Sequence, residues 1–220
     1  MNRFFAFGLV AGMAVPAAAA DPTGIKIDKD NKAVIIDAKI APRKLEKYDQ
    51  IYPVEVVACW PDPKGKKAHE TVVTIEVMPS VVHKALTDLG LKPGKPALGE
   101  DTVAEGPEVK VLLEIPDGGG TKRLSIHRFL VDPKTKQPFP RDVKFRFTGS
   151  AMAKPDPTKT DEVYAADLSG TLIAIYPVTN ETVCQTTLTM KEEKYLKLET
   201  DPALIPKEGT AVKLIIEAAK

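Results

Sequence analysis

The stretch Val143-Lys144-Phe145-Arg146-Phe147 alternates strictly between apolar and basic residues. Successive side chains of a β-strand point to opposite faces, so this pattern places the apolar side chains on one face and the basic side chains on the other. A strand with one buried face and one solvated face is typical of antiparallel sheets. The stretch therefore predicts a sheet made largely of antiparallel strands.

Further stretches of the chain also have strand character, because they are rich in β-branched residues and are bounded by Gly, Pro, Asp or Asn. These stretches are residues 32–40, 51–59, 69–77, 108–115, 122–131, 170–176, 181–190 and 210–218. The connections are short and turn-like, as at residues 28–32 and 116–122, which agrees with antiparallel neighbours. Pro53 lies inside one stretch and cannot donate a ladder hydrogen bond, so we expect that strand to lie at an edge or to begin later.

One segment has helical instead of strand periodicity. The helix is expected to begin after Pro79, with Ser80 as its N-cap. Apolar residues then recur at helical spacing, at Val82, Ala85, Leu86 and Leu89. Gly90 follows, where a left-handed C-terminal cap is expected. The fold prediction is mainly β: an antiparallel sandwich or a partly open barrel with one short helix packed on the sheet.

Residues 1–20 have the pattern of a secretory signal peptide. Arg3 precedes an apolar run that ends in Ala18-Ala19-Ala20, a small-residue pattern typical of signal peptidase cleavage. We therefore expect a mature chain of residues 21–220 that forms a single domain, in which residues 21–50 allow an N-terminal extension. No later stretch has the length and apolarity of a membrane helix, so the sequence predicts a periplasmic or extracellular protein without a transmembrane segment after cleavage.

The charge balance excludes some partners. The chain has 31 basic and 30 acidic residues, and cleavage would remove one basic residue, Arg3, which leaves 31 − 1 = 30 of each sign. A balanced chain gives no reason to expect nucleic acid as a partner. We expect another envelope protein or a small ligand instead.

Cys59 and Cys184 are the two cysteines of the chain. An exported chain enters an oxidising compartment, so the pair is a disulfide candidate, and the bond would stabilise the fold by about 5 kcal/mol. Two buried thiols on separate strands are the alternative. The spacing excludes a C-x-x-C redox pair, and two cysteines are too few to hold an iron–sulfur cluster.

His69 and Glu70 are the first candidates for chemistry, because a histidine beside a carboxylate suits a metal site or acid–base catalysis. Neighbouring strand residues point to opposite faces, so this pair converges only at a bulge or a strand end. His83 lies at the boundary of the apolar helix stripe. If the helix folds back over the strand, both histidines with Glu70 or Glu76 would suit zinc, although the strict H-E-x-x-H spacing is absent. Ordinary packing is the alternative for each histidine.

Other patterns favour structural interpretations. His127 is interpreted as a surface or hairpin residue, and Ser150, which follows a glycine, as part of a turn. The sequence GGGTK at 118–122 lacks the spacing and the following helix of a phosphate-binding loop, and no G-x-S-x-G motif occurs. An acidic group lacks a calcium-loop signature and is interpreted as solvated surface; it comprises Asp161, Glu162 and Asp167.

Several segments, in order along the chain from Val54 to Ile216, resemble the YdjY-type domain, a family of exported bacterial proteins common in planctomycetes. The segments are VVACWP, AHETVV, PSVVHKALTDLGLKPG, RFLVDPKTKQP, FTGSAM, YAADLSGTLIAIY and IPKEGTAVKLII. The resemblance implies that a set of residues belongs to family motifs, but it implies no enzymatic activity. That set is His69, Glu70, His83, Thr148, Gly149 and Ser150.

These observations lead to two functional hypotheses. The first is an exported, non-catalytic binding or accessory protein of the bacterial envelope, with the option of being a subunit of a larger assembly; it needs no cofactor. The second is a metal-binding protein or metal-dependent enzyme, using zinc or another transition metal held by His69, His83 and a nearby carboxylate. The sequence leaves open whether the protein is an enzyme.

Overall fold

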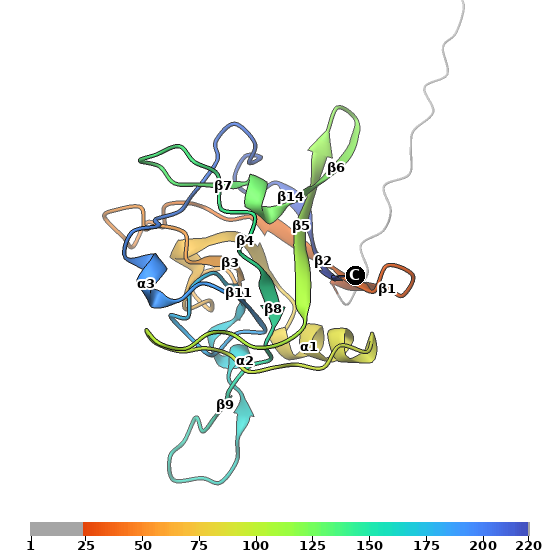
Figure 1. Ribbon diagram of the computed structural model, residues 1–220, viewed down its shortest axis with the longest axis vertical. Helices are drawn as coiled ribbons and strands as arrows, with labels where there is room; N and C mark the ends of the chain where they lie inside the picture. The colour runs from red at the N-terminus through yellow and green to blue at the C-terminus, as the bar shows by residue number, and fades with distance from the viewer. Residues whose placement is uncertain (1–23, 220) are drawn as a thin grey trace, which may run out of the picture.

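The main feature of the structure, a computed structural model that describes residues 24–219, is a closed eight-stranded β-barrel (Figure 1). The last strand in the ring, β4, pairs back onto the first, β2, and closes it. The mainly β prediction is confirmed, and the barrel is closed where the sequence left a sandwich or an open barrel as choices. In spatial order the strands are β2 (Ala33–Ile40), β14 (Ala211–Ala218), β5 (Glu108–Asp117), β8 (Phe145–Phe147), β12 (Cys184–Thr186), β11 (Thr171–Ala174), β3 (Val56–Cys59) and β4 (Thr71–Ile75).

Short strands extend this ring. β1 (Ile25–Asp28) pairs with the first half of β2, so residues from the 21–50 stretch are part of the barrel sheet. β6 (Gly120–Ser125) pairs with the second half of β5. Two small separate sheets pair β9 (Met152–Ala153) with β10 (Val163–Tyr164), and β7 (Leu130–Val131) with β13 (Glu199–Thr200).

Neighbouring barrel strands are antiparallel except for the pairs β3–β4 and β11–β12, which are parallel. The alternation in β8 is confirmed, since Phe145 and Phe147 are buried and Arg146 is half-buried. Every residue of β3, β11 and β12 is buried. β3 is continuously apolar, as expected of a strand covered on both faces. In β12 the buried Gln185 and Thr186 instead donate side-chain hydrogen bonds to backbone carbonyls.

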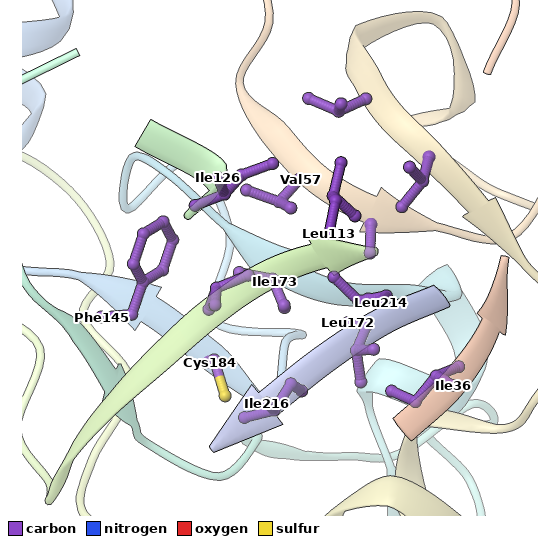
Figure 2. Packing of buried hydrophobic residues seen from close by; sticks show 14 of the residues in the cluster. Ile36, Val57, Leu113, Ile126, Phe145, Leu172, Ile173, Cys184, Leu214 and Ile216 are labelled. Carbon is purple, nitrogen blue, oxygen red and sulfur yellow. The ribbon is translucent and has the colours of Figure 1, made fainter. Parts of the chain in front are cut away.

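Aliphatic side chains from all around the ring fill the barrel. Figure 2 shows Ile36, Leu113, Leu214 and Ile216 packed together, and each of them is almost inaccessible to solvent. Burying one such side chain contributes about 1.5–3 kcal/mol, so the packed interior gives a rigid frame. The loops and helices at the two ends of this frame are therefore held in fixed positions.

Some predicted strands are shorter in the structure. The strand predicted at 51–59 begins at Val56, after Pro53, as the proline indicated. The strand predicted at 69–77 is preceded by a 3₁₀ turn, η1 (Ala68–Glu70). A second turn, η2 (Ile126–Arg128), interrupts the strand predicted at 122–131.

The predicted helix is present as α1 (Pro79–Asp88), with Val82 and Leu86 on its buried face. Its start differs from the prediction, because Pro79 occupies the first turn and Ser80 does not cap it. Instead the Ser80 backbone N–H donates to Asp167 Oδ1 at 2.9 Å. Gly90 follows with φ +92, so its predicted left-handed conformation is confirmed. Two single-turn helices, α2 (Ala166–Ser169) and α3 (Met190–Glu193), are too short to show periodicity in the sequence.

The disulfide expected between Cys59 and Cys184 is absent from the structure, where both thiols are free and buried. Strand β11 lies between the strands that carry them. The Cys59 sulfur contacts the Ser169 carbonyl at 3.8 Å, whereas Cys184 belongs to the barrel core (Figure 2). Burial raises the pKa of both thiols. The alternative of two buried thiols on separate strands is the arrangement observed.

The signal-peptide prediction concerns residues 1–20, which lie outside the described residues. Within residues 24–219, no helix has the length and apolarity needed to cross a membrane.

The register of the strands defines two ends of the barrel. β3 and β4 are parallel to each other, and β11 is antiparallel to β3. β12 is parallel to β11, and β8 is antiparallel to β12. β8 therefore runs in the same direction as β3 and β4, and all three strands finish at one end of the barrel. Helices α1 and α2 lie there and contact each other (Figure 1). We call this the helical end. The opposite end holds η1 and the beginnings of β3 and β4.

Candidate functional site

His83 lies at the helical end, half-buried on α1, in contact with two other aromatic rings. Its Nδ1 is 2.7 Å from the Tyr164 hydroxyl, and its ring packs edge-on against Phe147 with centroids 5.1 Å apart. The Ser150 backbone N–H donates to the same hydroxyl oxygen at 3.1 Å. Because the hydroxyl oxygen already accepts from the Ser150 N–H, we assign the hydroxyl proton to the bond with Nδ1. This assignment makes the neutral His83 the tautomer that carries its proton on Nε2.

Gly149 allows this close approach. Its φ is +67, and a Cβ atom at this position would lie 3.0 Å from Pro93 Cβ and 3.3 Å from His83 Cε1. Both the backbone conformation and the contact favour glycine. The flanking Thr148 is buried and donates its hydroxyl proton to the Val183 carbonyl at 3.1 Å.

Ser150 connects this corner to the next elements. Its hydroxyl lies 3.0 Å from the Ala151 carbonyl, to which it donates, and accepts from the Ala166 backbone N–H at 3.0 Å. No hydrogen bond joins it to His83 among residues 24–219. The turn predicted at Ser150 is therefore present, and the hydroxyl has no adjacent base of the kind that activates a nucleophile.

Burial controls the protonation of this cluster. It lowers the pKa of His83 and raises the pKa of Tyr164, so both groups are neutral at neutral pH. Within the described part of the chain, His83 Nε2 has no hydrogen-bond partner. Every side-chain nitrogen or oxygen that is buried in this part of the chain does have a partner, so Nε2 is not buried. The Nε2–H group is therefore accessible to solvent, as a single donor in a fixed position.

His69 lies in η1, at the opposite end of the barrel. Its Nε2 is 3.2 Å from Glu70 Oε1, so the adjacent pair does converge, at a strand end as the strand geometry requires. The ring packs against Tyr48 and Tyr52, with centroid distances of 4.5 and 5.1 Å. Arg43 Nη1 donates to the His69 carbonyl at 3.4 Å. Burial lowers the pKa of His69, although Glu70 opposes that shift.

Glu70 belongs to a charged cluster that the sequence did not reveal. Lys67 Nζ lies 2.7 Å from Glu70 Oε2 and 3.2 Å from Glu55 Oε2. Glu70 is 7% exposed, and burial followed by repulsion from Glu70 raises the pKa of Glu55. Nothing in the spacing of Glu55 and Lys67 indicates this contact, because the segment between them folds back along the barrel.

The structure does not bring His69 and His83 together, a convergence that the sequence allowed only if the helix folded back over the strand. The two imidazoles have separate neighbours, and β4 separates η1 from the segment that leads into α1. β4 has 5 residues and spans about 16 Å. Glu76, the other proposed carboxylate, is exposed after β4. Among residues 24–219, no three His, Cys, Asp or Glu side chains are grouped so that they could hold a metal ion.

The remaining candidates have structural contacts. His127 lies in η2, where Nε2 donates to the Val143 carbonyl at 2.9 Å and Nδ1 accepts from the Ser125 hydroxyl at 2.9 Å. Its ring stacks on Phe139. It is thus a half-buried packing residue after the β6 hairpin. Of the acidic group, Asp161 and Glu162 are exposed, while Asp167 accepts the hydrogen bond at the start of α1.

Comparison with known protein families identifies the domain. The YdjY domain matches residues 25–217, nearly the whole described chain, so the chain belongs to that family. No curated protein and no solved structure matches it.

Proposed function

We propose that this YdjY-domain protein is an exported, non-catalytic binding protein of the bacterial envelope that recognises a partner protein at its helical end. The observation that carries the proposal is the fixed Nε2–H of His83. Tyr164 holds the imidazole neutral and oriented, and Ser150 holds Tyr164. A donor held in this way suits recognition of an acceptor group on a partner, because little side-chain entropy is lost on binding.

The apolar surface near this donor supports a protein partner. Met152 pairs across the β9–β10 ladder with Tyr164 and is 54% exposed. Leu168 on α2, with Met78 and Val81 at the start of α1, adds further exposed apolar side chains. α1 packs on α2, and α2 packs on β10. Methionine and aromatic residues are enriched in protein interfaces, where charged residues are depleted from the centre.

The hydrogen bonds of the cluster support a non-catalytic role. His83 is bonded to Tyr164 and not to the Ser150 hydroxyl, which is engaged with backbone groups. The cluster thus lacks the pairing of nucleophile and base on which covalent catalysis depends. Support for export comes from residues 1–20 alone, whose pattern is that of a signal peptide.

Site-specific crosslinking tests the proposal. A photo-crosslinking amino acid is placed at Met152 in the mature protein, and the matched control carries it at Tyr195, which is 72% exposed at the opposite end. In intact cells we expect a discrete crosslinked partner from Met152 only. Equal crosslinking from both positions would contradict the proposal.

The purified partner then allows a quantitative test. We expect His83→Gln to weaken binding about tenfold in calorimetry, the effect of losing one well-placed hydrogen bond at an interface, at a temperature where thermal unfolding shows that the variant is folded. Tyr195→Ala is the control and should bind normally. Unchanged affinity of the His83 variant would overturn the role assigned to Nε2–H.

The alternative function, metal binding through His69, His83 and a carboxylate, has its own test. Metal content is measured in protein purified without chelator, beside a His69→Ala/His83→Ala variant. Stoichiometric zinc that is lost in the variant would replace the binding-protein proposal.

A further inference from the structure

Strand β5 changes partners along one of its edges, and this change creates a groove. On that edge β5 pairs with β8 at Glu108 and Val109, and with β6 from Leu112 onward. Its other edge pairs continuously with β14. At the change of partner, η2 leads the chain away from the sheet. A groove of about 490 Å³ lies between β5, β6 and β8, within the size range of small-molecule sites.

The groove has an apolar floor. In β5 the odd-numbered residues Val109 and Val111 point into the barrel core, so Leu112 points outward. Leu112 and Leu124 of β6 are both half-buried and both line the groove. A ligand in the groove would therefore contact apolar side chains beneath it.

The walls are strongly basic. One carboxylate, Glu108, lines the groove, against five permanently charged cations. The cations come from β5, β6, η2 and the segment leading into β8, and they are Lys110, Arg123, Arg128, Arg141 and Lys144. Charges of the mature chain balance overall, so this excess of positive charge is local to the groove.

These cations are weakly neutralised. Lys110 and Lys144 have loose pairs with carboxylates, at 3.4 and 3.5 Å. Arg123 has a closer pair, at 2.9 Å, but it too is exposed. Such surface pairs contribute about 0–1 kcal/mol each. The side chains of Arg128 and Arg141 have no hydrogen bond or ion pair with any described residue.

Lys110 and Lys144 border the groove from neighbouring segments. Val109 lies opposite Phe145 in the β5–β8 ladder. Lys110 follows Val109, Lys144 precedes Phe145, and both lysines are exposed and line the groove. A bound anion would offset the positive charge that gathers here.

His127 fixes one wall without competing for a ligand. Both ring nitrogens are already bonded, Nε2 to the Val143 carbonyl and Nδ1 to the Ser125 hydroxyl. The contact holds η2 against the segment that carries Arg141 and Lys144. The two guanidinium groups of Arg128 and Arg141 thus project from backbone that is held in place.

We infer that this groove is a second binding site, which takes a small organic oxyanion, a carboxylate or a phosphate ester, with a short apolar portion. Guanidinium groups bind either oxyanion through paired N–H donors, and the floor of Leu112 and Leu124 would contact the apolar portion. The site is separate from the His83 cluster, and it does not depend on the function proposed for the helical end.

Calorimetric titration of the mature protein tests the inference with two probes, phthalate and phenyl phosphate. Each carries oxyanion groups and an aromatic ring, so the two probes distinguish carboxylate from phosphate recognition. At about 50 mM salt we expect saturable binding of at least one probe with a Kd of about 1 mM or tighter, weakening as salt is raised. Binding of either probe alone would identify the preferred oxyanion and would support the site.

A charge-matched pair of variants locates the binding. Arg128→Gln/Arg141→Gln should weaken it at least about tenfold. Lys64→Gln/Lys154→Gln removes the same charge from exposed positions outside the groove and should change it less than about twofold. His83→Gln should leave anion binding unchanged. The inference is overturned if neither probe binds saturably, or if both double variants lose binding equally.

Discussion

The two ends of the barrel each hold a half-buried histidine, but they stabilise it in different ways. At the helical end, His83 is held by a hydrogen bond between uncharged groups, with Tyr164, and by close packing against Gly149. At the opposite end, His69 lies beside a cluster in which Lys67 holds two carboxylates. Both histidines belong to segments that resemble family motifs, yet they do not form one site. We therefore expect the helical end to respond to changes of volume, and the opposite end to changes of charge and pH.

The largest effect is expected for Gly170→Ala at the helical end. Gly170 has φ +72, and an added Cβ would lie 2.6 Å from Trp60 ring carbons. Trp60 cannot move easily, because its Nε1–H donates to the Val77 carbonyl at 2.8 Å just before α1. Overpacking and left-handed strain together should cost about 3–5 kcal/mol in urea unfolding. This cost in stability should be the same at about pH 5 and pH 7. Gly209→Ala is the control: it has the same left-handed backbone strain, but nothing lies within 4 Å of the added Cβ, so its smaller cost measures strain without overpacking.

The next largest effect is expected for Lys67→Met at the opposite end. The variant leaves Glu55 and Glu70 without their shared cation, which should cost about 2–3 kcal/mol at neutral pH because both carboxylates are largely buried. Protonation of Glu55, whose pKa is raised by burial, should reduce this cost as pH falls. Urea unfolding across pH measures it, with Lys66→Met, whose pair with Glu181 is exposed, as the control. A cost independent of pH would remove the distinction between the two ends.

A smaller effect is expected for Tyr164→Phe. The variant leaves the Ser150 N–H and His83 Nδ1 without their partner, which should cost about 1–2 kcal/mol. Burial lowers the pKa of His83, and the variant keeps that burial, so the pKa of His83 should stay below the ordinary 6.5. NMR titration of the imidazole measures the pKa, and Tyr195→Phe is the control. A pKa at or above 6.5 would show that the hydroxyl, and not burial, keeps His83 neutral.

The smallest effect is a gain of stability in Glu55→Gln. Burial and then Glu70 raise the pKa of Glu55 above 4.5, so folding favours the protonated form and stability falls as pH rises through the folded pKa. A neutral glutamine removes this loss. Thermal unfolding should show a gain of about 1 kcal/mol at neutral pH that disappears at about pH 4, below both pKa values. A loss of stability at neutral pH would mean that the ion pair with Lys67 outweighs burial.

The features that the sequence predicted correctly depend on residues close together in the chain. Alternation in 143–147 indicated β8, Pro53 indicated the late start of β3, and Gly90 indicated the left-handed end of α1. In each case the local backbone geometry limits which residues are tolerated. Ser80 is the instructive failure, because the acceptor at the start of α1 is Asp167, which lies 87 residues away in the chain.

The candidate site was only partly predictable, for the same reason. The sequence indicated His83, Gly149 and Ser150 as motif residues, but it did not indicate Tyr164, which joins them. It also left open that His83 and His69 form one site. The relative positions of α1 and β10 follow from strand order in the barrel, and strand order leaves no local pattern.

The sequence by itself determined that the protein is mainly β, where its main helix lies, and which side chains face the core, because these follow from the periods of strand and helix. Only the tertiary structure decided that the barrel closes through β2 and β4, that the cysteines stay apart, and that the two histidines lie at different ends. These outcomes depend on contacts between residues that are distant in the chain. Such contacts are selected by the packing of the whole core, and no short segment contains them.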